Sequence, residues 1–296
     1  MDFSEKVISR LCVISDEITQ QAGVSLSMLR EDEIHSLVSG NKFRKLKYNV
    51  LFVQENKLKG IVTYGGPHSN HVAATAVACQ LANISCIGFV RKGFGNLINT
   101  PTLETAVDAG MQVHWLDNDT FTAQKLRNEV DEEDFLHIPE GGANTLGVKG
   151  CGEILIGIPR GAEIIAVACG TGSTLAGMLQ AAESEQQLLG VNVLKAPGMM
   201  QKEVSKWTVK KNYQILDDYH FGGYAKANEE LFTFIAWFYK QHGIMLDMVY
   251  TGKLMFALYQ EMKTGKLVNK KVVAIHTGGL QGNKGMEKRY GVSLFK

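Results

Sequence analysis

The sequence has little proline and no excess of either charge. Only five prolines occur in 296 residues, and no linker rich in proline and serine divides the chain. The 31 lysine and arginine residues nearly cancel the 30 aspartate and glutamate residues, which leaves a formal net charge of +1. A broad electrostatic surface for nucleic acid or anionic lipid is therefore not expected. The expected partner is a small molecule, with neither nucleic acid nor a membrane.

The cysteines are few and lack the spacing of a metal site. They lie at positions 12, 79, 86, 151 and 169, which is an odd number with no C-x-x-C pair and no histidine spacing typical of zinc. We therefore expect no metal and a reducing compartment. Long apolar runs are also absent, because no stretch approaches the roughly 18 residues that would cross a membrane. These features favour a cytoplasmic protein.

Short apolar runs alternate with helical patterns along the chain. This alternation of strands with amphipathic helices is typical of βαβ units and a mostly parallel sheet. Expected strands lie at residues 24–29, 60–64, 84–90, 111–116, 135–138, 163–168, 188–194 and 271–276. Expected helices lie at residues 70–81, 102–108, 174–183, 229–241 and 253–263.

The length allows two lobes, but nothing separates them in tandem. We therefore predict interleaved lobes, with a smaller lobe at residues 46–144 and a larger lobe formed by residues 1–45 and 145–296. The lone G-x-G at residues 92–98 lacks a third glycine and a preceding strand, so we expect a surface loop there.

A glycine-rich turn between a buried strand and a helix is the strongest local signal. Residues 163–177 read EIIAVACGTGSTLAG, and Gly170, Thr171, Gly172, Ser173 and Thr174 fall at the turn. Free N–H groups at a helix N-terminus form an anion cradle, most naturally for phosphate. The alternatives are a tight turn without a ligand and a methyltransferase loop for S-adenosylmethionine. That second alternative expects an acidic residue where Asn192 stands, and a P-loop is excluded because no Gly-Lys-Ser/Thr closes the turn.

A second turn of this kind occupies residues 61–71, IVTYGGPHSNH. Ser69 is a good N-cap for the following alanine-rich helix, and Ser69 and Asn70 could do no more than cap it. The two glycines before the cap would also let the backbone close around a substrate carboxylate.

A cluster of four cations begins at Lys42 and would ordinarily form a solvated helix face. The Ser39-Gly-Asn lead-in distinguishes Lys42, because it places one lysine at a helix start beside a flexible turn. Partial desolvation there would lower the lysine pKa and favour the neutral amine that a Schiff base needs.

Together these segments resemble the family of pyridoxal 5'-phosphate (PLP) enzymes that contains 1-aminocyclopropane-1-carboxylate (ACC) deaminase and D-cysteine desulfhydrase. The resemblance extends from about residue 30 to residue 282. It implies the tryptophan-synthase-like fold, PLP fold type II, which is an α/β fold with two interleaved lobes of open, mostly parallel twisted sheets flanked by helices. Its motifs are Arg30-Glu-Asp, Ser39-Gly-Asn-Lys-Phe-Arg-Lys-Leu, Gly65-Gly-Pro-His-Ser-Asn, Thr171-Gly-Ser-Thr-Leu-Ala-Gly, Val249-Tyr-Thr-Gly-Lys and His276-Thr-Gly-Gly.

The same resemblance implies roles for individual residues. Catalytic roles fall to Lys42, which would bond covalently to PLP, and to Ser69, Tyr250 and Tyr224, although either tyrosine could be a core aromatic with a satisfied hydroxyl. Substrate contacts would come from Ser69, Asn70, His71 and Thr251, through backbone N–H groups at the first three. Cofactor contacts would come from Lys42, Lys45, Asn70, Gly170, Thr171, Gly172, Ser173, Thr174 and Thr277.

Two departures within the family point to the reaction. The ACC deaminases carry Glu and Leu where this chain has Thr251 and Thr277. Desulfhydrase-like members carry hydroxyl residues at both positions. The sequence therefore favours β-elimination from a small amino acid, most naturally D-cysteine, with release of pyruvate, ammonia and hydrogen sulfide. ACC deaminase, a related racemase or dehydratase, and a non-catalytic PLP-binding relative are the alternatives, and the resemblance implies a homodimer.

Overall fold

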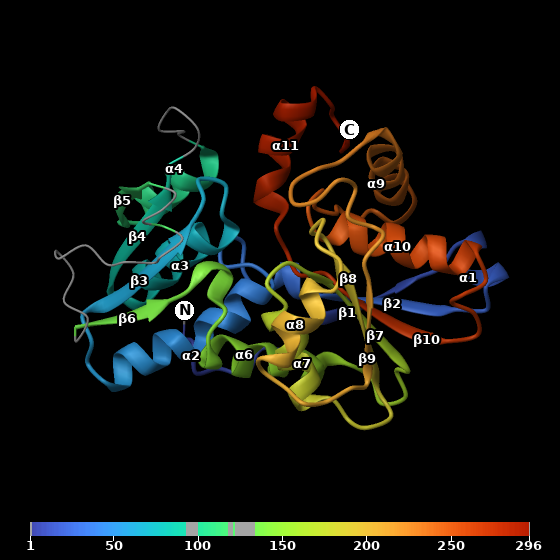
Figure 1. Ribbon diagram of the computed structural model, residues 1–296, viewed down its shortest axis with the longest axis horizontal. Coiled ribbons are helices and arrows are strands. Elements are labelled where there is room, and N and C mark those ends of the chain that lie inside the picture. The colour runs from blue at the N-terminus through green and yellow to red at the C-terminus, as the bar shows by residue number, and fades with distance from the viewer. Residues whose placement is uncertain (1, 93–99, 118–120, 122–133, 296) are drawn as a thin grey trace.

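A computed structural model describes residues 2–92, 100–117, 121 and 134–295. Two lobes stand side by side, each built on its own sheet (Figure 1). Most of the expected loop at residues 92–98 lies outside the described residues. No helix in the described ranges combines the length and apolar character that crossing a membrane requires.

The smaller lobe contains a parallel sheet in the order β5-β4-β3-β6. Apolar side chains alternate between its two faces, as expected for a buried parallel sheet. Ile61 packs with the helices on one face, whereas Val62 packs with the aromatic rings of Tyr64 and Phe89 on the other. Its elements are α2 (Asn41–Glu55), β3 (Gly60–Gly65), α3 (Asn70–Ala82), β4 (Ser85–Arg91), α4 (Pro101–Asp108), β5 (Gln112–Leu116) and β6 (Phe135–Ile138).

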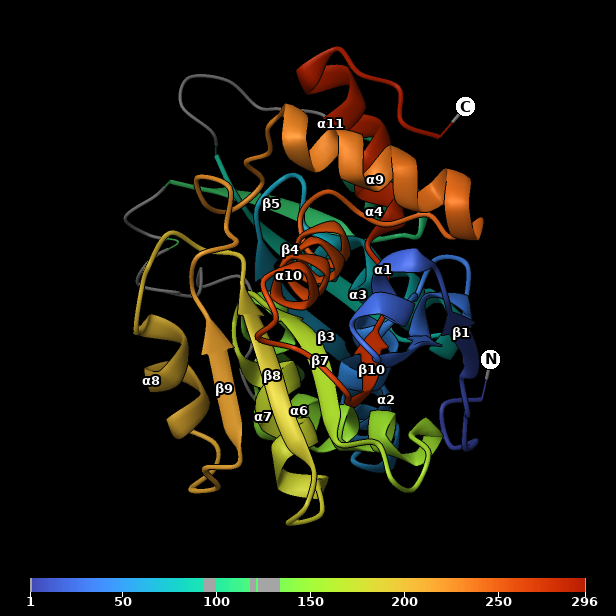
Figure 2. The ribbon, with the colours of Figure 1, turned by 90° about the vertical axis from the view of Figure 1, so that its right-hand side faces the viewer.

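The larger lobe contains a six-stranded sheet in the order β1-β2-β10-β7-β8-β9. All neighbouring strands are parallel except β1, which is antiparallel to β2. Strands β10, β7, β8 and β9 follow one another across the sheet in Figure 2. The strands are β1 (Arg10–Ile14), β2 (Ser25–Arg30), β7 (Ile164–Cys169), β8 (Gln187–Asn192), β9 (Tyr213–Leu216) and β10 (Lys271–Ile275). The sheets confirm the predicted α/β class, and β1 and β9 are edge strands that the sequence patterns missed.

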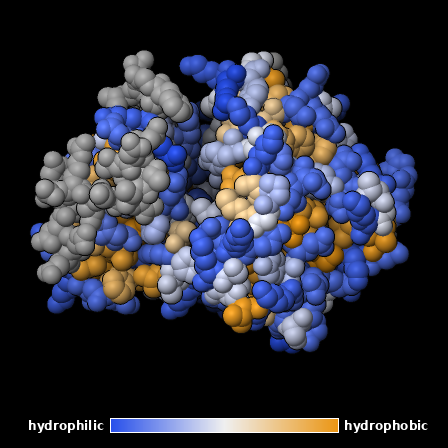
Figure 3. Space-filling model, in the orientation of Figure 1, coloured by the Kyte–Doolittle hydropathy of each residue, from blue (hydrophilic) through white to orange (hydrophobic). Residues whose placement is uncertain are grey.

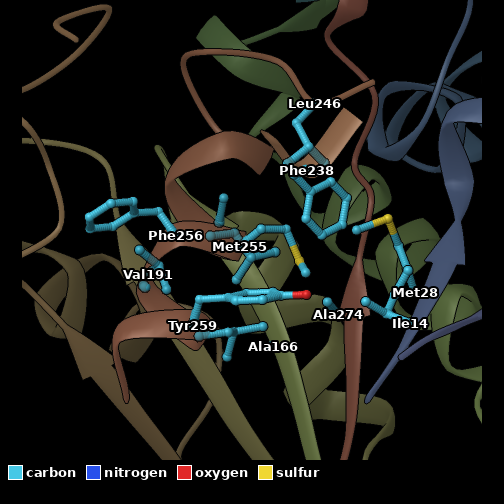
Figure 4. Packing of buried hydrophobic residues seen from close by; sticks show 14 of the residues in the cluster. Ile14, Met28, Ala166, Val191, Phe238, Leu246, Met255, Phe256, Tyr259 and Ala274 are labelled. Carbon is cyan, nitrogen blue, oxygen red and sulfur yellow. The ribbon is translucent and has the colours of Figure 1, made fainter. Parts of the chain in front are cut away.

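Helices cover both faces of the larger sheet. On one face Ala166 and Ala168 pack under α9 and α10 (Figure 4). On the other face Ile165 and Val167 pack against α7 and α8. The helices are α1 (Glu17–Gln21), α6 (Thr145–Gly152), α7 (Ser173–Ala181), α8 (Met199–Ser205), α9 (Glu229–His242), α10 (Thr251–Lys263) and α11 (Asn283–Tyr290), with 3-10 turns η1 (Glu31–Glu33), η2 (Glu140–Gly142), η3 (Glu153–Gly157) and η4 (Leu280–Gly282).

The boundary expected at residues 45 and 46 falls inside helix α2, which is continuous. Phe43, Leu46 and Val50 of this helix all pack in the core of the smaller lobe, where Phe3 stacks on Phe43 with ring centroids 5.7 Å apart. We therefore propose that the smaller lobe begins at Gly40, six residues earlier than the sequence suggested.

Candidate active site

A cavity lies between the lobes where the turns after β3, β7 and β10 converge. Each turn follows the carboxyl end of a parallel strand, which is where open α/β sheets bind ligands. The predicted Lys42, Asn70, Gly170, Tyr250 and Thr277 all line this cavity. Residues from five separate segments of the sequence are thereby brought together.

Lys42 lies in the first turn of α2 and reaches the cavity. The helix begins after Gly40, which has a φ of 63° and lies against the backbone of Thr277. Within the described part of the chain, the amine of Lys42 has no hydrogen-bonding or ion-pair partner. Burial, assisted by the positive charge of Lys45, lowers the pKa of Lys42 to about 7. A large fraction of the Lys42 amine is therefore neutral near pH 7, as nucleophilic chemistry requires.

Lys45 lies one turn later on the same helix and is buried. Its Nζ donates to the carbonyl oxygen of Gly141 and to Oγ of Ser173, each at 2.8 Å. Gly141 belongs to the turn after β6, and Ser173 begins α7 in the larger lobe. Lys45 therefore places a cation beside the glycine-rich turn and links the two lobes.

The glycine-rich turn surrounds one end of the cavity with backbone and small hydroxyls. Helix α7 begins at Ser173, after Gly172 with a φ of 75°. A Cβ atom at Gly170 would lie 3.2 Å from Cε1 of Tyr250, so a side chain there would crowd the cavity. Thr174 accepts a hydrogen bond from Nδ2 of Asn41 at 2.9 Å. The free N–H groups of this helix start are suited to an anion.

The turn after β3 presents Asn70 to the cavity. Ser69 caps α3 by accepting a 3.3 Å hydrogen bond from the backbone N–H of Val72. Oδ1 of Asn70 is buried and has no hydrogen-bonding partner within the described residues. Such an amide requires a ligand or water.

His71 is buried and is not among the residues that line the cavity. Its Nε2 lies 2.9 Å from Oγ1 of Thr63, and burial with nearby Lys42 and Lys45 holds the pKa of its imidazole well below the ordinary value. The ring is therefore neutral, and the predicted contact of His71 with substrate depends on its backbone N–H.

Of the two predicted tyrosines, Tyr250 lines the cavity and Tyr224 lies behind it, outside the lining. Tyr250 precedes α10 and lies on the cavity wall. Tyr224 contacts it edge to face, with ring centroids 6.1 Å apart, and remains 51% exposed on the outer side. Burial raises the pKa of Tyr250 well above its ordinary value. Tyr250 is therefore a neutral phenol that can donate a hydrogen bond but is a poor base.

The two threonines that distinguish the reactions occupy different environments. Thr277 lines the cavity. Thr251 is fully buried outside it, and its hydroxyl donates to Oδ1 of Asp247 at 2.8 Å. The structure therefore does not bring the Thr251 side chain to the cavity, and its predicted contact with substrate has no support from this geometry.

Three residues of the site escaped the sequence analysis as individuals. Asn41 orients Thr174, and the carbonyl of Gly141 holds Lys45. Asp247 fixes the turn that leads into α10 by accepting from the N–H groups of the second, third and fourth residues after it. The Gly-Gly pair after β6 follows a strand, so the rule that found the other two turns could have found Gly141.

The side chains present fit PLP. A desolvated lysine, an unpartnered buried asparagine oxygen and an anion cradle face one cavity, which matches a cofactor that carries an aldehyde, a ring oxygen and a phosphate. Fold and site together define a PLP enzyme of fold type II.

Comparisons with known proteins assign the family. The model for "Pyridoxal-phosphate dependent enzyme" matches residues 12–278, so the chain belongs to this family and PLP is its cofactor. A putative ACC deaminase of Pyrococcus furiosus is 32% identical over 90% of this chain and 88% of its own. A D-cysteine desulfhydrase of Klebsiella pneumoniae is 26% identical over 88% and 89%. A crystal structure of an ACC deaminase homologue has a TM-score of 0.80, with 27% identity, and covers 96% of this chain and 94% of its own.

Proposed function

We propose that this enzyme is a lyase that eliminates the β-substituent of a small amino acid, most naturally the thiol of D-cysteine. The products would be pyruvate, ammonia and hydrogen sulfide. The similarity to a D-cysteine desulfhydrase along most of both chains supports this reaction.

The choice of reaction rests on the residues that line the Lys42 cavity. The described residues that line the Lys42 cavity include no carboxylate, and Thr277 contributes a neutral hydroxyl. We propose Thr277 as the partner of the ring nitrogen of PLP. A carboxylate partner would keep that nitrogen protonated and strengthen the ring as an electron acceptor, which matters most when a carbon–carbon bond breaks. Loss of a thiolate requires a weaker electron acceptor than the breaking of a carbon–carbon bond.

The remaining residues would hold the cofactor. PLP supplies an acceptor for the electron pair that forms at the substrate Cα. In this proposal Lys42 bonds to it, the N–H groups and hydroxyls from Gly170 to Thr174 bind its phosphate with Lys45 nearby, and Asn70 bonds its ring oxygen. The unpartnered Oδ1 of Asn70 supports that last assignment.

The proton transfers would fall to Lys42. With a pKa near 7, its amine can accept the Cα proton and return one at neutral pH. Tyr250, as a neutral phenol, would donate a hydrogen bond to the departing sulfur, and Tyr224 would orient Tyr250 through the ring contact. Backbone N–H groups at Ser69, Asn70 and His71 would hold the substrate carboxylate, and the hydroxyl of Ser69 would assist.

ACC deaminase is the second candidate, because several relatives carry that name, among them the 32% identical protein. The decisive experiment offers the purified holoenzyme D-cysteine, L-cysteine and ACC, and measures sulfide and 2-oxo acid. We expect sulfide and pyruvate from one cysteine enantiomer. Efficient 2-oxobutanoate release from ACC without sulfide would reverse the assignment, and no turnover of any substrate would favour a non-catalytic PLP-binding protein.

The assembly and compartment belong to the same proposal. We place the enzyme in the cytoplasm as a homodimer. The odd number of cysteines and the four thiols that are buried as free cysteines support a reducing compartment. The dimer rests on the family resemblance.

A further inference from the structure

A second cavity adjoins the first and opens between the lobes beside α11 (Figure 3). Its volume is about 500 Å³. Asn70, Tyr250, Gly279 and Gln281 line both cavities, so the two share part of their lining and lie directly beside each other. A substrate amino group near Lys42 would therefore have its β-substituent free to extend into this outer space.

The outer cavity is larger than cysteine requires. Cavities of roughly 300–1,000 Å³ hold ligands of drug size, whereas the side chain of cysteine is a single methylene with a thiol. A thioether with a longer sulfur substituent would use the space that cysteine leaves empty.

The hydrogen-bonding capacity that remains free in the outer cavity favours an anion. Its described lining contains two ionised side chains, Asp247 and Arg289. The carboxylate of Asp247 already accepts hydrogen bonds from three backbone N–H groups and from the hydroxyl of Thr251. It therefore has little capacity left for a ligand cation.

Arg289, in contrast to Asp247, has few hydrogen-bonding partners among the residues that the structure describes. Within the described chain it has no carboxylate partner, and its one hydrogen bond is a long contact of 3.4 Å to the carbonyl of Ala225. A guanidinium has five N–H donors in a planar fork that matches a carboxylate. Most of these donors are available to a ligand at the cavity mouth.

The facing wall comes from the smaller lobe. Pro101 and Thr102 belong to the first turn of α4, whose N-terminal end carries partial positive charge. His68 lies beside them, and its burial and the charge of Arg289 lower the pKa of its imidazole. A neutral imidazole can still donate a hydrogen bond. Donors from both lobes therefore face one space.

We propose that Arg289 and this facing wall bind a distal anionic group, so that the preferred substrates are S-substituted cysteines whose sulfur substituent ends in a carboxylate. The inference rests on the proposed β-elimination and narrows its substrate class. In the reaction the Cβ–S bond breaks with its electron pair on sulfur, and the Cα proton passes to Lys42. The sulfur leaves as a thiol, and the three-carbon remainder takes up one water to give pyruvate and ammonium.

The test compares S-carboxymethylcysteine with its neutral analogue S-carbamoylmethylcysteine, both enantiomers of each, on the holoenzyme. Variants are Arg289→Gln and, as a matched control, Lys288→Gln, which removes a neighbouring exposed charge from the same helix without touching the cavity. We expect kcat/KM to favour the carboxylate by about tenfold or more, as one charge-assisted hydrogen bond would give. Arg289→Gln should abolish this preference mainly through KM, and Lys288→Gln should keep it.

A binding measurement separates the two proposals. Calorimetry with 3-(carboxymethylthio)propanoate, which lacks the amino group and cannot turn over, should give tighter binding than its amide, and the difference should vanish in Arg289→Gln. That result without any elimination would support the anion site and refute the proposed function. Elimination of both thioethers at equal kcat/KM, or a preference unaffected by Arg289→Gln, would overturn the anion site and leave the β-elimination intact.

Discussion

Nζ of Lys253 lies 2.8 Å from the carbonyl oxygen of Gly223, the residue before Tyr224. The same ammonium donates to the carbonyl of His220, also at 2.8 Å, and it is fully buried in α10. Gly223 has a φ of 118°, which side-chain-bearing residues rarely adopt. The buried ammonium of Lys253 therefore fixes the conformation of the loop at residues 220–223, and this conformation holds Tyr224 against Tyr250.

We predict that Lys253 is a positioning residue that acts through Tyr224. Lys253→Met should lower kcat/KM by about tenfold, because a lost charge-assisted hydrogen bond is worth about that factor. Burial lowers the pKa of Lys253 to about 8, so the wild-type rate should fall above that pH as the ammonium becomes a weaker donor. Activity should fall far less from Lys253→Met when Tyr224→Ala, which removes the ring that contacts Tyr250, is already present. Additive losses would contradict coupling through the tyrosine, and circular dichroism checks that each variant is folded.

Lys42 should be the lysine that retains the cofactor. Borohydride reduction of the holoenzyme should fix one PLP per chain, and peptide mapping should find it on Lys42. Lys42→Ala should lose this label, whereas Lys45→Ala should keep it with weaker PLP affinity, because Lys45 lies beside the phosphate cradle. A label on Lys45 in the wild-type protein would refute the assignment.

The rate at which the apoprotein captures PLP should rise with pH. The neutral amine reacts, and the folded pKa of Lys42 is lowered to about 7 from 10.5. The capture rate should therefore rise with pH and reach half its maximum near pH 7. Free Nα-acetyl-lysine, measured alongside by absorbance, should show its midpoint near the ordinary value of about 10.4. A capture rate that keeps rising to pH 10 would contradict the desolvated lysine.

Gly40 should tolerate no side chain. A Cβ atom there would lie 2.0 Å from the carbonyl oxygen of Thr277, and its φ of 63° already disfavours other residues. Gly40→Ala should lower the free energy of unfolding by at least about 2 kcal/mol. Gly285→Ala is the control, because a Cβ there meets nothing within 4 Å and alanine favours a helix. Urea unfolding of both variants measures the difference, and equal midpoints would refute the steric argument.

Thr277 should affect the choice of reaction, whereas Thr251 should affect stability. Thr277→Leu removes the cavity hydroxyl and should lower the ratio of kcat/KM for cysteine to that for ACC. Thr251→Val removes the hydrogen bond to Asp247 and should lower the free energy of unfolding by about 1–3 kcal/mol with little change in that ratio. Thr251→Glu should destabilise the protein more, because it buries a second carboxylate beside Asp247. A ratio changed by Thr251→Val alone would reverse these roles.

Sequence patterns located the site better than its details. The strand-to-helix turns after β3 and β7 were evident because buried parallel strands are continuous apolar runs that end abruptly at glycine. The edge strand β9 was missed because its four residues are only partly buried and show no clear alternation. The side chain of Thr251 was assigned to substrate because its family position was known, whereas its direction depends on where α10 begins.

Contacts between distant segments were not accessible from the sequence. The partner of Lys45 on the far side of the cavity is Ser173, 128 positions away. The ring of Tyr224 meets Tyr250 only because the intervening loop returns to the start of α10. Family resemblance could suggest that both tyrosines belong to the site, but their mutual orientation follows from packing alone.

The strand order of the larger sheet has a consequence for how the chain folds. Strand β10 lies between β2 and β7, so the position beside Ser25 is filled only by Lys271, near the other end of the sequence. During synthesis the smaller sheet can form from consecutive residues, and β2 can pair with β1, whereas the other edge of β2 must wait for nearly the whole chain. Contacts of such long sequence separation slow folding and leave unpaired strand edges open to aggregation. Folding on the ribosome would therefore begin with the smaller lobe and finish with insertion of β10.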